Sequence, residues 1–279
     1  MYDVGNVWRI DTMTRRIVTA FLICSFLLAP ITSALAAGNA LSIQYEEPQN
    51  GKQQRAKNAI KDSGVVEKIA EYINTNLQLP EPMMLRITAN GSDEARYDNK
   101  TRTIEIPYGL WSECHTCFEK EYSDKDVGNV LDELCKAVVA YSIYRELGHA
   151  FVDVYDLSAR KYADTATDEF AVLMLIDSFH SGRDMALIAG DYLVLRDKQR
   201  YKVADKGLIS KLVLHNTRVL AAYCMAYGVL PDEELKQEML ELKISEKRLE
   251  QCIVDAESKV AEWVEWLKRH GKLHEKQHD

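Results

Sequence analysis

The stretch Tyr144-Arg145-Glu146-Leu147-Gly148-His149-Ala150 lies inside a segment, residues 126–156, whose apolar spacing predicts a long helix. One face of that helix is marked by residues spaced four, three, four and four apart: Leu134, Val138, Tyr141, Arg145 and His149. The first three of these are apolar or aromatic, so the face is expected to be buried. Arg145 therefore lies on the face that turns inward. Burying an arginine without a partner is very unfavourable, so the sequence predicts an acidic side chain against Arg145.

Glu146 and His149 stand at two positions of the H-E-x-x-H motif, which zincin peptidases carry on a helix. In that motif two histidines bind zinc and the glutamate activates the bound water. Arg145 stands where the first histidine belongs. The pair Glu-x-x-His is common in ordinary amphipathic helices, so the alternative is a packed helix whose histidine has found a hydrogen-bond partner.

Two carboxylates begin the next predicted helix, residues 165–179. Asp164 and Asp168 are four residues apart, like the Glu-x-x-x-Asp pattern that supplies a third zinc ligand and an orienting aspartate in one branch of zincins. Asp164 taken alone is equally well explained as a helix cap. With the preceding helix, we interpret Asp164 as a candidate ligand and Asp168 as the orienting acid. Asp153, four residues after His149, is a substitute ligand or an acid at the helix end.

Several separated segments agree, in order, with one known family: residues 95–98, 104–108, 145–153, 164–175, 227–228 and 246–248, with Arg218, Cys224 and Cys252. They resemble a bacterial family of metallopeptidase-like proteins known as domain of unknown function 4344. Its usual motif is His-Glu-Leu-Gly-His-Ala, followed by an acidic pair and Asp-x-Phe-Ala. The resemblance spans Met84 to Leu267 and implies a zincin-like fold, zinc held by His149 and Asp164, and Glu146 as the catalytic base.

The arginine sets this chain apart from the family motif. The guanidinium of Arg145 stays protonated, offers no lone pair to a metal, and would repel a nearby dication. Asp164 is also shorter than the usual glutamate. We therefore expect zinc binding to be weak or absent.

Three functions remain open at this point. The first is a catalytically degenerate metallopeptidase homologue that binds something in its cleft, with Arg145 paired to Asp164 and also to Asp168 or Glu146. The second is an active metallohydrolase with rearranged ligands: His149, Asp164 and Asp153 or Asp168. The third is a non-catalytic binding or structural protein of the periplasm. A peptide or protein partner fits the first and the third.

The pattern of the remaining chain predicts an α+β fold, with a small antiparallel sheet packed on a mostly helical body. The strands are expected at residues 84–88 and 103–106, and helices at Val66–Leu77, 209–227 and 245–269. The polar residues 37–54 are predicted to be a linker. Residues 55–279 are then a single zincin-like domain that ends in a polar tail.

The N-terminal segment has the features of a secretory signal peptide. The basic Met13-Thr14-Arg15-Arg16 precedes the apolar run Ile17–Ala29 and the small-x-small site Ala34-Leu35-Ala36. We expect residues 1–36 to be removed and the mature protein to be periplasmic or secreted. Met13 is an alternative start, which would leave out residues 1–12. An uncleaved anchor is disfavoured because the run is short. No integral membrane span is expected after cleavage.

Charge and cysteines complete the sequence evidence. The net charge is −8, which gives no electrostatic footprint for nucleic acid. Disulfides persist in exported proteins, and Cys224 and Cys252 lie in neighbouring helical segments, so we predict that they are bridged. Among Cys114, Cys117 and Cys135 we expect one disulfide and a leftover thiol rather than a metal site; which two pair is left open.

Overall fold

The computed structural model describes residues 40–77, 79, 81–123, 128–155, 163–201 and 216–270, all within one compact unit, Ala37–Asp279. Its strands are β1 (Leu41–Tyr45), β2 (Met83–Thr88), β3 (Arg96–Asp98) and β4 (Thr103–Pro107). Its helices are α1 (Gly51–Ser63), α2 (Val65–Asn76), α3 (Tyr108–Glu121), α4 (Gly128–Val154), α5 (Ala163–Ser178), α6 (Gly182–Arg200), α8 (Thr217–Val229), α9 (Glu233–Glu241) and α10 (Glu246–His270). The predicted α+β class, with helices dominating, is confirmed.

The sheet is mixed, in the order β1-β2-β4-β3, so the prediction of an antiparallel sheet is wrong. β1 pairs with β2 in parallel, β2 pairs with β4 in parallel, and the β3–β4 pair alone is antiparallel within the described chain. The reason lies in the reversed strand β3. The chain leaves β2, runs back along β3 and turns into β4, which inserts between the two and so points the same way as β2.

The predicted linker over residues 37–54 is also wrong for the part that the structure describes. Residues 41–45 form the edge strand β1, with Leu41 buried against the sheet. Asn50 caps α1, because its side chain accepts a hydrogen bond from the backbone N–H of Gln53 at 3.0 Å. Gly64, with φ of 62°, then ends α1 and lets α2 start at once.

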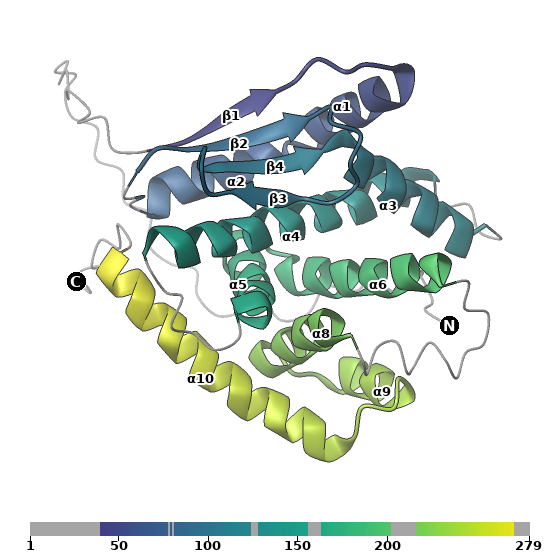
Figure 1. Cartoon of the computed structure of the whole chain (residues 1–279). Helices are drawn as coiled ribbons and strands as arrows, with labels where there is room; N and C mark the ends of the chain where they lie inside the picture. The colour runs from purple at the N-terminus through teal and green to yellow at the C-terminus, as the bar shows by residue number, and fades with distance from the viewer. Residues whose placement is uncertain are drawn as a thin grey trace, which may run out of the picture. The chain divides into compact units, whose positions relative to one another are not determined.

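Helix α4 is the centre of the fold. The sheet lies on one side of it, and α5, α6 and α8 lie on the other (Figure 1). Its inward side chains are almost all inaccessible to solvent, including Val139, Ile143 and Leu147. This placement buries most of the helix between the sheet and the helical layer.

The later helices agree in part with the sequence. α10 begins after Ser245, as predicted, and the Ser245 hydroxyl accepts a hydrogen bond from the backbone N–H of Arg248 at 3.3 Å. The helix predicted over residues 209–227 corresponds to α8, which starts at Thr217; residues 209–215 lie outside the described part. Helices α3, α6 and α9 were not predicted, and α3 and α6 help to form the site described next.

Candidate functional site

Helices α4 and α5 approach each other closely at Gly148. A Cβ atom at that position would lie 3.1 Å from Cδ1 of Phe170 and 3.2 Å from Cβ of Thr167, tighter than ordinary contact. Glycine therefore permits a spacing at which the side chains of α4 reach those of α5. Arg145 lies three residues before this contact.

Asp168 of α5 is the hub that joins three helices. Its Oδ1 atom accepts hydrogen bonds from the hydroxyl of Tyr141 at 2.7 Å, from Nε of Arg145 at 3.0 Å and from Nε of Arg218 at 3.3 Å. The Asp168 side chain has no solvent exposure, and Oδ2 has no hydrogen-bond donor among the described residues. One buried carboxylate thus ties α4, α5 and α8 together, in ion pairs with two arginines.

Glu146 accepts a hydrogen bond from a second nitrogen of the Arg145 guanidinium. Nη1 of Arg145 donates to Oε1 of Glu146 at 2.7 Å, and both side chains are largely buried. Burial raises the pKa of Glu146, while the positive charge of Arg145 acts in the opposite direction. Two of the acidic partners considered for Arg145, Glu146 and Asp168, are therefore present, whereas the side chain of the first one, Asp164, lies outside the described part of the structure.

Burial also affects the neighbouring groups of the hub. It raises the pKa of Tyr141, and the negative charge of Asp168 raises it further, so this hydroxyl keeps its proton and acts as a donor. For Arg218, burial lowers the pKa, but the charge of Asp168, the hydrogen bond to it and the further acidic neighbours together outweigh burial, and the net shift is upward. The hub is therefore a stable network of two cations and two carboxylates.

The remaining predicted residues are placed differently. His149 is half-buried one turn along α4, with Nε2 3.4 Å from the hydroxyl oxygen of Thr167. Asp153 is exposed and accepts a hydrogen bond from the hydroxyl of Tyr97 on β3 at 3.1 Å. Asp164 lies in the first turn of α5, and its side chain is outside the described part of the structure.

The described donors do not fit a zinc ion of the predicted kind. A catalytic zinc site needs three protein ligands and an open position for water. In the parts of the chain that the structure describes, no three histidine, cysteine, aspartate or glutamate side chains gather closely enough to hold a metal. Arg145 instead places a guanidinium against two of the carboxylates that such a site would use. The expectation of weak or absent zinc stays a prediction.

A cavity of about 220 Å³ opens beside this network. It lies between α4, α6, the start of α8 and residues 93–95, and we call it the α4–α6 cavity. Charged side chains on its wall include Arg145 and Glu146 from α4, Arg196 from α6 and Arg218 from α8. Two motif residues, Arg145 and Glu146, thus line the cavity, whereas His149 does not.

Sequence reasoning did not assign Arg196 and Arg218 to the site. Arg218 follows the capped start of α8, where the Asn216 side chain accepts from the backbone N–H groups of Arg218 and Val219. Nothing local marks it as the partner of an aspartate fifty residues earlier. The sequence did contain one signal for a buried polar network: Tyr141 and Arg145 are four residues apart, so two polar groups lie on the inward face of α4.

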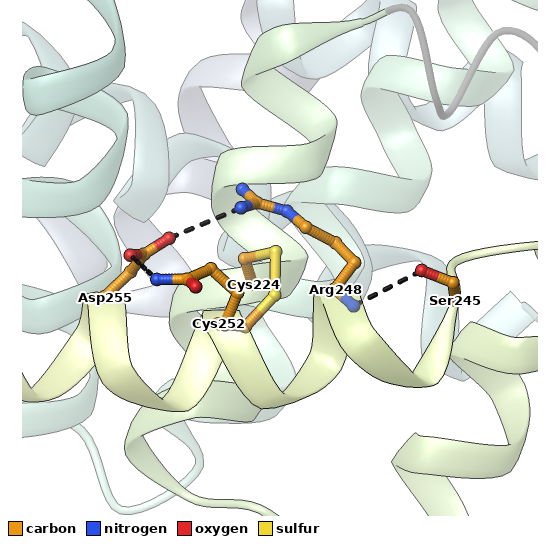
Figure 2. The surroundings of a disulfide bond; sticks show 6 residues. Cys224, Ser245, Arg248, Cys252 and Asp255 are labelled. Carbon is orange, nitrogen blue, oxygen red and sulfur yellow. Dashed lines mark hydrogen bonds and ion pairs between the residues drawn. A yellow bond between two sulfur atoms is a disulfide. The ribbon is translucent and has the colours of Figure 1, made fainter.

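The cysteines divide into one bridge and three thiols. Cys224 of α8 and Cys252 of α10 form the predicted disulfide, with Cα atoms 4.9 Å apart (Figure 2). The helices meet closely there. Cys114, Cys117 and Cys135 are buried free thiols, so the disulfide expected among them is absent from this structure. Burial raises the pKa of Cys117 to about 11 and keeps it protonated.

In the described structure, the Arg-Glu-x-x-His sequence of the central helix faces an acidic residue on the following helix. Residues 45–267 match the family domain of unknown function 4344, described as "Putative metallopeptidase", and the chain belongs to that family. No curated protein and no solved structure matches the chain. Within the described residues, none of the helices combines the length and apolar character needed to cross a membrane.

Proposed function

We propose that this protein is a catalytically degenerate, zincin-like member of its metallopeptidase family that binds a ligand in the α4–α6 cavity without hydrolysing it. The observation that carries the proposal is the position of Arg145, whose guanidinium contacts Glu146 at 2.7 Å and Asp168 at 3.0 Å. Oε1 of Glu146 accepts from the guanidinium, so this oxygen is less available as a base. It is therefore poorly placed to take a proton from water.

The ion network offers the structural tie that a metal gives to two helices in active relatives of this type. Asp168 on α5 is joined to Arg145 on α4, and Arg218 of α8 adds a third attachment. Arg145 and Arg218 balance the negative charges of Asp168 and Glu146, so the net charge of the site is neutral without a divalent cation. Export through cleavage after Ala36 is part of the same proposal, and it rests on the sequence of the leader.

The test is metal analysis and a peptidase assay on the mature protein, beside an Arg145→His variant. We expect the unmodified protein to hold little zinc and to cleave no peptide. Arg145→His restores the family motif and should raise zinc uptake. A matched control is Arg183→His, because Arg183 is a helix arginine that pairs with Asp232 far along the chain from this motif. The control should leave zinc content unchanged.

One result would overturn the proposal in favour of an active enzyme with rearranged ligands. That result is near-stoichiometric zinc in the unmodified protein, lost when His149 is changed to alanine. It can be obtained without the Arg145→His variant, so the test stands even if that variant folds poorly.

A further inference from the structure

Arg196 differs from the other arginines of the α4–α6 cavity. Arg145 and Arg218 each donate to Asp168 within 3.3 Å. Arg196 instead has Nη1 3.8 Å from Oε1 of Glu94, beyond hydrogen-bond distance, and its buried Nε has no acceptor among the described residues. Its ion pair with Glu94 is therefore longer than those of the other two arginines and includes no hydrogen bond.

The surroundings of Arg196 hold its guanidinium at the cavity wall. The side chain is 14% exposed, and its guanidinium carbon lies 5.7 Å from the ring centre of Tyr192, within the range of a cation–π contact. The Tyr192 hydroxyl donates to Glu113, whose pKa is raised by burial. A guanidinium that is mostly removed from water and has a buried Nε without an acceptor among the described residues is costly, so a negative group entering the cavity would be stabilised there.

The charges around the opening restrict the kind of anion. Asp93 and Glu94 line the cavity, and Glu94 is exposed. Inside, Arg145 and Arg218 are already balanced by Glu146 and Asp168. A doubly charged phosphate would face these acids with one arginine that has an unused donor, whereas a carboxylate carries a single charge and matches the planar arginine fork.

Building on the proposed function, we propose that the α4–α6 cavity binds a free amino acid or short peptide as a zwitterion. Its carboxylate contacts Arg196, and its ammonium group faces Asp93 and Glu94. The volume of about 220 Å³ agrees with a ligand of this size, since cavities for drug-sized molecules are larger, about 300–1,000 Å³. The ligand uses the one arginine of the wall that makes no hydrogen bond to a carboxylate among the described residues.

The experiment measures binding of defined probes to the mature protein. The probes are the twenty common amino acids, an equimolar tripeptide library with free ends, the same library amidated at the C-terminus, the same library acetylated at the N-terminus, and inorganic phosphate. Retained compounds are identified by mass spectrometry after size exclusion, and their affinities are measured by calorimetry. We expect compounds with both ends free to bind, and amidation or acetylation to weaken binding.

Two variants locate the site. Arg196→Gln should weaken binding roughly 10- to 100-fold, the range expected for loss of a hydrogen-bonded charge. The matched control is Arg200→Gln, one turn further along α6: Arg200 lies 3.6 Å from the same Glu94 but does not line the cavity. It should keep the affinity of the unmodified protein.

Several results would overturn the inference. They are no binding by any amino acid or free-ended tripeptide, equal binding by the amidated library, binding of phosphate in preference to the others, or full affinity in a folded Arg196→Gln variant. If that variant does not fold, the comparison of free and amidated peptides on the unmodified protein still tests whether binding requires the carboxylate. Zinc content and peptidase assays are independent of all these outcomes, so failure here is distinguishable from failure of the proposed function.

Discussion

Replacing Asp168 tests whether the buried ion network holds the helices together. Asp168→Asn keeps the size of the side chain and an acceptor for Tyr141, but it removes the charge that faces Arg145 and Arg218. The Arg145 side chain is 16% exposed and that of Arg218 is 30% exposed, so water can compensate Arg218 better than Arg145. Breaking a buried pair by removing one partner costs about 3–5 kcal/mol. Because Glu146 still contacts Arg145, we expect the lower end, about 3 kcal/mol, for asparagine, and the upper end for alanine.

Urea unfolding of the mature protein, with the disulfide intact, measures this change. A loss of about 3 kcal/mol corresponds to a decrease in Tm of roughly 6–12 °C for a chain of this size. The matched control is Asp255→Asn, since Asp255 pairs with Arg248 at 3.4 Å on the surface, where both side chains are more than 40% exposed. Such a pair contributes less than about 1 kcal/mol. If Asp168→Asn changes stability no more than the control does, the network is not what joins α4 to α5.

Three further predictions concern the rest of the molecule. Replacing Cys224 and Cys252 by serine should lower the free energy of unfolding by about 3–4 kcal/mol, the value for a loop of this length, measured by urea unfolding against the oxidised parent. Burial raises the pKa of Asp191 to about 6, so between about pH 4 and 6 the folded chain retains a proton that the unfolded chain has lost. The free energy of unfolding should therefore fall by up to about 3 kcal/mol as pH rises through that range. The Asp191→Asn variant should remove this part of the pH dependence in unfolding curves, because its amide oxygen still accepts from the hydroxyl of Tyr223 but does not titrate. N-terminal sequencing of exported protein should find Ala37 first, and residues before Ala34 on the mature form would contradict the leader assignment.

The elements that the sequence predicted are those with a clear apolar period. The long helix α4, the strands β2 and β4 and the last helix α10 lie within a few residues of their expected positions. α6 was missed because apolar side chains do not form one stripe along it. Gly190 interrupts it, and a Cβ there would lie 2.6 Å from the ring of Tyr223 on α8. That helix is stabilised by its packing between neighbours, which a local pattern cannot reveal.

The candidate site was predictable only as far as one helix and the start of the next. The spacing of Arg145, Glu146 and His149 placed them on α4, and the need for a buried acid anticipated the ion pairs. The choice of Asp168 as the hub could not be read from spacing, because it depends on Arg218, which arrives from another helix. The sheet direction failed for a similar reason: it is decided by where β4 inserts, and strand patterns carry no information about insertion.

The position of Arg145 between two carboxylates also has an evolutionary consequence. Arginine and histidine codons can differ by a single base, so the family motif lies one mutation away. That mutation would leave Glu146 without its cation and Asp168 with only Arg218, at a place with little access to water. Under the proposed function, such a chain would depend on a bound metal to tie the two helices together, whereas Arg145 supplies that tie from within the chain. Under that proposal, a mutation of Arg145 to histidine is tolerated only where zinc is available to replace the ion pairs.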